Sequence, residues 1–168
     1  MKTLVLNIAM LLQIGCSSSQ NKDVRQDRNI RDSTTYSYKM FSTLKGDTLN
    51  YIRENFISKK KFYENKPLSI LLKNVELPIT SHNPTFGNPP NVEQVMGIHL
   101  RFDTEVTELS KFNKKKTPNS LLILLKQPIN YKEAVSILKK NGRNWTNDSQ
   151  DFYGKFTIED IMFIGNRN

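Results

Sequence analysis

Two segments in the middle of the chain have the hydrophobic pattern of β-strands. Along residues 94–103, apolar side chains alternate with polar or small ones, which predicts a strand with one core face and one polar face. The apolar positions are Met96, Ile98, Leu100 and Phe102. Residues 121–125 are all Leu or Ile and lie between Pro118 and Pro128, which predicts a central strand covered on both faces.

Three segments have the helical spacing of apolar residues instead. The first is 48–58, with Asp47 as its expected N-cap, and the second follows Pro67, which suits the first position of a helix. The third follows Asn130, its expected cap, and Gly142 is expected to end it. The side chains predicted to face the core are Leu49, Ile52 and Phe56, then Leu68, Leu71, Leu72 and Val75, then Tyr131, Ala134, Val135 and Leu138.

The remaining segments are polar or rich in proline. Residues 81–91 contain three prolines and a glycine, which predicts a loop. Residues 104–117, with room for one helical turn, and residues 143–150 are also expected to be loops. Residues 77–80 and 156–164 are predicted strands, although a helix cap near the start of the latter is the alternative. Together these elements predict an α+β fold with a mixed sheet of about four strands and about three helices.

The chain begins with a basic head and a short apolar run. Lys2 precedes residues 4–15, which are apolar except for Asn7 and Gln13. A helix that spans a bilayer needs about 20 apolar residues, so this run is too short and has the pattern of a signal peptide. A buried N-terminal helix is the alternative, but no second, polar helix face marks one.

The end of this apolar run resembles the lipobox of bacterial lipoprotein precursors. Residues 11–16 read Leu-Leu-Gln-Ile-Gly-Cys, and a serine-rich segment follows. That family normally has leucine three residues before the cysteine, where this chain has Gln13, with Leu12 one position earlier. The resemblance implies cleavage after Gly15 and attachment of acyl chains to Cys16, the only cysteine. A buried free cysteine is the alternative interpretation.

The resemblance divides the chain into a signal peptide over residues 1–15, a lipidated stem over 16–40 and one α+β domain over 41–168. The stem is polar and cannot bury enough apolar surface to offset the entropy of ordering it. The acyl chains on Cys16 would tether the protein to a membrane of the bacterial cell envelope. We expect the outer membrane or the cell surface rather than the inner membrane.

The chain is strongly basic, with a formal net charge of +9. Cleavage would remove Lys2 and leave +8. A basic, lipid-anchored protein is expected near anionic lipids, an envelope polymer or an acidic protein. Lysine clusters within residues 59–66 and 111–116 would suit an acidic partner. Export and the lack of a recognition motif argue against nucleic acid.

Candidate chemistry lies mainly on one predicted strand face. His99, Arg101 and Asp103 are spaced by two, so they share the polar face and offer a base, an anion clamp and an acid. The alternative is an ordinary solvent-exposed sheet face. Neither His82 nor His99 has the spacing of a metal motif, and we find no nucleophile elbow or glycine-rich phosphate loop. We therefore expect no metal, no cofactor and no residue of a known catalytic motif.

Trp145 is a second candidate contact residue, because it lies among amide, hydroxyl and carboxylate side chains that suit a sugar ring. The alternative is a tryptophan folded over the edge of the core. These observations leave three functions open. The first is a non-catalytic binding or structural protein of the envelope. The others are an envelope hydrolase acting on wall or glycan material, and an immunity or inhibitor protein that binds a toxic enzyme.

Overall fold

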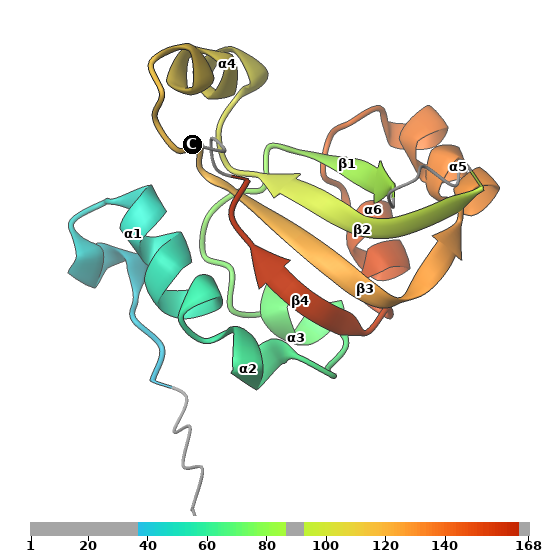
Figure 1. The fold of residues 1–168 in the computed structure, drawn as a ribbon, viewed down its shortest axis with the longest axis horizontal. Helices are drawn as coiled ribbons and strands as arrows, with labels where there is room; N and C mark the ends of the chain where they lie inside the picture. Colours follow the sequence, from blue (N-terminus) through green and yellow to red (C-terminus); the bar gives the residue numbers. More distant parts are fainter. Residues whose placement is uncertain (1–36, 87–92, 165–168) are drawn as a thin grey trace, which may run out of the picture. The chain divides into compact units, whose positions relative to one another are not determined.

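The computed structural model describes residues 37–86 and 93–164 (Figure 1). The predicted signal peptide, Cys16 and most of the predicted stem lie outside the described residues. The described part contains a four-stranded sheet and six α-helices, which confirms the α+β class. Its contacts begin before Phe41, because the hydroxyl of Tyr38 lies 2.7 Å from that of Tyr51.

The sheet consists of β1 (Ser81–Phe86), β2 (Gln94–Arg101), β3 (Ser120–Asn130) and β4 (Ile158–Met162). The strands lie side by side in chain order, and every neighbouring pair is antiparallel (Figure 1). The sheet is therefore antiparallel where a mixed one was expected. Antiparallel neighbours do not need a crossover helix on each face, so one face can remain partly open.

The hydrophobic core lies on one face of this sheet. Ile98, Ile123 and Ile161 are neighbours across β2, β3 and β4, and each is at most 1% exposed. On the opposite face, Leu122 and Leu124 are only half-buried. β3 is central, as predicted, but its two faces are not equally covered, because nearly all of the helices pack on the core face.

Four short helical segments precede the sheet. They are η1 (Phe41–Leu44), α1 (Thr48–Ile52) with its π-helical continuation η2 (Arg53–Ile57), α2 (Lys60–Tyr63) and α3 (Leu68–Leu72). Three helices lie between or after the central strands: α4 (Glu105–Asn113), α5 (Tyr131–Asn141) and α6 (Asn147–Tyr153). Every helical group except α4 contributes to the core, with side chains that include Phe56, Leu71, Ala134 and Tyr153.

The predicted helix caps are confirmed. Asp47 accepts a hydrogen bond from the amide of Asn50 at 2.9 Å, and Asn130 accepts one from the amide of Lys132 at 2.9 Å. Gly142 follows α5 with a φ of 63°, a conformation that favours glycine. Pro67 is the N-cap of α3 rather than its first residue. These local signals explain why the starts of α1 and α5 were predictable.

The predicted loop over residues 81–91 is wrong for its first half, since residues 81–86 form β1. Pro84 is tolerated because β1 is the edge strand of the sheet, and the isolated bridge on its outer side lies at Ser81 and Asn144, away from Pro84. The expected strand at 77–80 is not formed. The helices α4 and α6 were also expected to be loops. Both are polar, so their hydrophobic spacing is weak, and they begin at the threonine caps Thr104 and Thr146.

The predicted alternation along β2 changes at a bulge. The pairing with β3 shifts between Val95 and Gly97, which brings Val95 to the core face together with Ile98. Met96 is half-buried instead of being a core residue. The strand also ends at Arg101, two residues before Asp103. The strand after α6 is confirmed, with β4 falling inside the predicted range.

Candidate functional site

His99 and Arg101 lie on the same face of β2, as the sequence predicts. Glu108 of α4 reaches this face, where its Oε2 contacts Arg101 Nε and its Oε1 lies 3.7 Å from His99 Nε2. His99 and Glu108 are each 7% exposed. The alternative of a solvent-exposed polar face is therefore wrong here, because the segment after β2 folds back over the strand as a helix.

The guanidinium of Arg101 is also held from β1. With the Asn83 amide oriented to satisfy its neighbours, Oδ1 accepts from Arg101 Nη1 and Nη2 at 2.6 and 2.9 Å, and Nδ2 donates to the carbonyl of His82 at 3.0 Å. We call the set Asn83, His99, Arg101 and Glu108 the β2–α4 junction. A buried charge is tolerated only when it is paired and hydrogen-bonded, and Arg101 has both kinds of partner.

The imidazole of His99 is uncharged at neutral pH. Burial, with a smaller contribution from the positive charge of Arg101, lowers the pKa of His99 to about 4. A general base needs access to its substrate, and a catalytic carboxylate needs freedom to exchange a proton. The imidazole is buried and the carboxylate of Glu108 is engaged by Arg101, so this geometry suits attachment of α4 to the sheet better than catalysis.

Asp103 belongs to a neighbouring network rather than to the β2–α4 junction. Its carboxylate accepts two hydrogen bonds from Lys111 Nζ, at 3.0 and 2.7 Å. It also accepts one from the backbone amide of Asn119 at 2.7 Å and one from the side-chain Nδ2 of Asn119 at 3.0 Å. Asp103 is 8% exposed. It ties the end of α4 to the start of β3. Of the three residues proposed from the sequence, the structure therefore brings two together and assigns the third to a separate contact.

The sequence reasoning missed Glu108 and Asn119, which complete these two networks. The available signal was the cap at Thr104, whose side chain accepts from the amide of Thr107 at 3.3 Å. A helix starting there would place Glu108 and Lys111 one turn apart on one face. Nothing in the local sequence indicates that this face packs on His99 and Arg101.

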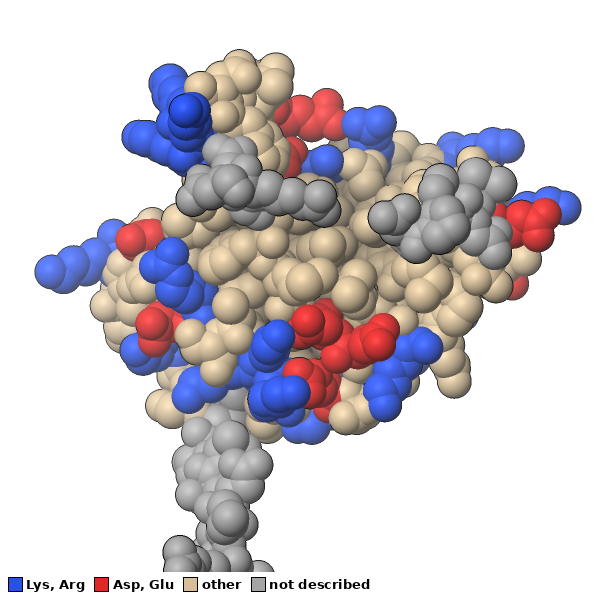
Figure 2. All heavy atoms as spheres, viewed as in Figure 1, with Lys and Arg blue, Asp and Glu red and all other residues tan. Residues whose placement is uncertain are grey.

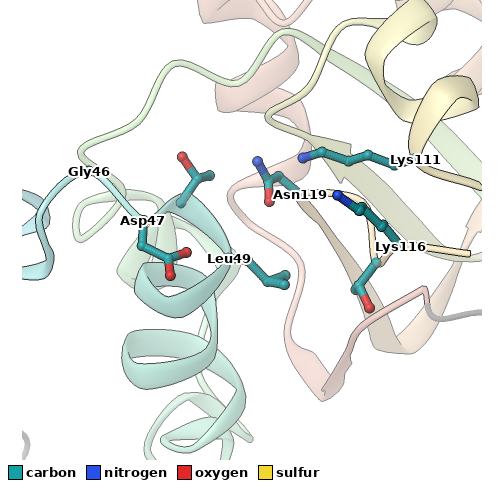
Figure 3. A pocket seen from close by; sticks show the side chains of 8 residues that line it. Gly46, Asp47, Leu49, Lys111, Lys116 and Asn119 are labelled. Atoms are coloured by element: carbon teal, nitrogen blue, oxygen red, sulfur yellow. The ribbon is translucent and has the colours of Figure 1, made fainter. Parts of the chain in front are cut away.

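An open pocket of about 500 Å³ lies between the start of α1 and the turn that follows α4. Asp47 and Leu49 line it from α1, and Lys111, Lys116 and Asn119 point into it from the opposite side (Figure 3). Lys111 is neutralised by Asp103, whereas Lys116 has no carboxylate within ion-pair distance in the described part of the chain. The pocket can therefore receive a negatively charged group at Lys116.

The turn after α4 adds more positive charge next to this pocket. Lys114, Lys115 and Lys116 are all exposed, and Lys115 has a φ of 54°. The turn is fixed by a hydrogen bond from the Lys116 amide to the carbonyl of Lys111 at 2.8 Å. Figure 2 shows basic side chains gathered beside α4. This basic turn, Lys114 to Lys116, is the most concentrated charge of the α4 region.

Trp145 lies at the edge of the core, before α6. Its ring stacks on Tyr153 with centroids 6.3 Å apart, and it meets the His82 ring edge-on at 5.2 Å. Trp145 is half-buried, while His82 and Tyr153 are fully buried. Burial lowers the pKa of His82 below its ordinary value and raises the pKa of Tyr153 to about 12. The packing matches the core-edge alternative and leaves part of the indole accessible.

In residues 37–86 and 93–164, no cluster of three or more His, Cys, Asp or Glu side chains has the geometry of a metal site. None of the helices described is both long enough and apolar enough to span a membrane. Comparisons with protein-family models, with curated proteins and with solved structures gave no match.

Proposed function

We propose that this chain is a lipid-anchored protein of the bacterial cell envelope, with a non-catalytic binding role. The observation that carries this proposal is the position of Cys16, which ends a short apolar run and precedes a serine-rich stem. Acylation would tether the α+β domain to a membrane surface through the stem. The domain would then meet its partners close to that surface.

The binding role is supported by how the polar residues are used. The β2–α4 junction and the Asp103 network consume the charges of Arg101, Glu108 and Lys111 internally. The pocket at Lys116 and the basic turn leave positive charge facing solvent. Exposed charge of one sign steers an oppositely charged partner. An acidic protein or an anionic envelope polymer is the ligand class that fits.

The geometry of His99 favours binding over the hydrolase alternative. A hydrolytic site would need the imidazole or a carboxylate to reach the substrate. His99 lies beneath α4, and Glu108 is held by Arg101. An immunity or inhibitor role remains the second candidate, because an acidic toxic enzyme would be complementary to the basic turn.

Acyl labelling tests the anchor. The full chain is expressed in a bacterium that processes lipoproteins and is grown with an alkyne fatty acid. We expect label on the wild-type chain and on a Ser17→Ala control, and none on Cys16→Ala, which should be uncut or released from the membrane. Equal labelling and equal membrane fractionation of Cys16→Ala would contradict the anchor.

A capture experiment from the same envelope tests the binding role. Wild type is compared with Lys116→Glu, which reverses the charge in the pocket, and with Lys73→Glu, which alters an exposed lysine at the end of α3. We expect a stoichiometric acidic protein or polymer that is lost from Lys116→Glu and kept by Lys73→Glu. A partner bound equally by all three would contradict a role for the pocket.

A further inference from the structure

The outer face of α4 carries two apolar side chains that nothing in the described part of the chain covers. Val106 is 80% exposed and Leu109 is 61% exposed, the highest values among the exposed large hydrophobic residues of the described segments. They are three positions apart on one helix, so they lie next to each other. An apolar side chain normally faces the core, where it is shielded from water, but both of these side chains face the solvent.

The inner face of the same helix explains this orientation. α4 is attached to the sheet by polar contacts, from Glu108 to Arg101 and from Lys111 to Asp103. The helix therefore does not depend on Val106 or Leu109 to stay in place. The two residues form an exposed apolar tip on a helix whose other face is attached to the sheet.

The basic turn lies at the C-terminal end of this tip. Lys114, Lys115 and Lys116 follow α4 directly, and among the described residues none of them has an ion-pair partner. Basic side chains are seen beside α4 in Figure 2, and α4 stands at one end of the sheet in Figure 1. An apolar pair and three lysines therefore share one exposed end of the domain.

We infer that this end of the domain docks onto an anionic lipid bilayer. Val106 and Leu109 would enter the boundary between headgroups and acyl chains, and the basic turn would pair with lipid phosphates. A lysine near an anionic surface strengthens binding about fivefold, so three of them matter even for a small apolar tip. The inference rests on the proposed function only in that the anchor at Cys16 brings the domain to a membrane.

The composition of the tip favours a bilayer over a protein partner. Protein interfaces are enriched in aromatic residues and arginine and depleted in lysine, and their strongest contacts come from aromatic or arginine anchors in pockets. The tip and the basic turn together supply two aliphatic side chains and three lysines. Interfacial membrane helices combine lysine or arginine with leucine or aromatic side chains, and this end of the domain supplies the lysines and Leu109.

The test measures whether the tip enters a bilayer, and it does not depend on acylation of Cys16. The full-length chain carries Cys16→Ser, so that Leu109→Cys provides the only thiol for an environment-sensitive dye. The matched control places the dye at Ser136→Cys, an exposed position on α5. Circular dichroism confirms folding of each labelled chain. The probes are vesicles of phosphatidylcholine with phosphatidylglycerol, and vesicles of phosphatidylcholine alone.

We expect the dye at position 109 to shift to the blue with the anionic vesicles and the dye at position 136 to stay in water. Replacing Lys114, Lys115 and Lys116 by Gln should raise the vesicle concentration needed by about a hundredfold, because about fivefold per lysine multiplies over three lysines. No shift at position 109, an equal shift at position 136, or no effect of the lysines would overturn the inference. If the tip binds an acidic protein instead of a bilayer, the vesicles will produce no shift at position 109. None of these results affects acyl labelling of Cys16, so the two proposals fail separately.

Discussion

Arg101 of β2 and Glu108 of α4 form an ion pair whose side chains are only 14% and 9% exposed. The pair joins α4 to the sheet, and Glu108 also lies 3.7 Å from His99 Nε2. Removing one partner of a buried pair leaves the other charge without compensation. The attachment of α4 to the sheet therefore depends on Glu108, whereas Val106 and Leu109 of the same helix are exposed.

Glu108→Ala is expected to lower the free energy of unfolding by about 3–5 kcal/mol, because Arg101 would remain charged and nearly buried. Urea denaturation of the full chain measures this loss. Glu105→Ala on the same helix is the matched control, since Glu105 pairs with Arg143 in an exposed contact where both side chains are 62% exposed. That control should lose less than about 1 kcal/mol. Equal losses for the two variants would contradict the buried role of Glu108.

His99 should make the protein less stable as the pH falls from about 6.5 to about 4. In this range the unfolded chain protonates His99 while the folded chain keeps it neutral, so the unfolded state binds more protons and is favoured. The difference between pKa values of 6.5 and about 4 corresponds to a loss of about 3 kcal/mol in the free energy of unfolding. Attraction between a protonated His99 ring and Glu108 would make this loss smaller. Denaturation midpoints measured across this range should fall more steeply for wild type than for His99→Gln. Parallel curves would show that His99 does not titrate between the two states as proposed.

Tyr51 and Tyr153 are both fully buried, but their hydroxyl groups differ. The Tyr51 hydroxyl accepts from the amide of Glu76 and donates to the carbonyl of Asn74, both at 2.9 Å. The Tyr153 hydroxyl has no hydrogen-bond partner among the described residues. Tyr51→Phe should therefore destabilise the fold by about 1–3 kcal/mol, and Tyr153→Phe should be neutral or stabilising by up to about 1 kcal/mol. Thermal unfolding of the two variants side by side gives the comparison, and the reverse order would contradict it.

Gly97 of β2 lies where a side chain has no room. A Cβ at this position would be 2.5 Å from the carbonyl oxygen of Ile123 on β3. Gly97→Ala should therefore push the two strands apart at the bulge and destabilise the fold by about 1–3 kcal/mol. Ser136→Ala on α5, an exposed position, is the control and should stay within about 0.5 kcal/mol of wild type. Urea denaturation measures both variants. A free energy of unfolding for Gly97→Ala equal to that of wild type would show that the strands can shift without loss of stability.

Much of the secondary structure was predictable because its signals are local. The caps Asp47 and Asn130 act on amides two or three residues away, and Gly142 ends α5 through its own backbone conformation. β3 was recognisable from residues 121–125, although it extends to Asn130 through a bulge. The polar helices α4 and α6 were missed, because a cap without an apolar stripe is a weak signal.

The candidate site was only partly predictable. Two-residue spacing correctly placed His99 and Arg101 on one face of β2, because that spacing is a property of the strand itself. It misassigned Asp103, because the strand ends at Arg101 and the chain then turns. It also missed Glu108, whose role appears only when α4 packs on the strand. The pocket at Lys116 joins segments more than sixty residues apart in the sequence, from Asp47 to Asn119.

The sequence by itself therefore determined the elements whose causes lie within a few residues: the helix caps, the aliphatic central strand and the α+β class. The lipoprotein-like N-terminus stays a prediction from the sequence. The tertiary structure decided the antiparallel order of the sheet, the edge position that lets Pro84 sit in a strand, and the burial of His99 and Arg101 under α4. The physical reason is range. Caps and periodicity act along the chain, whereas desolvation and ion pairing depend on which distant element covers a residue.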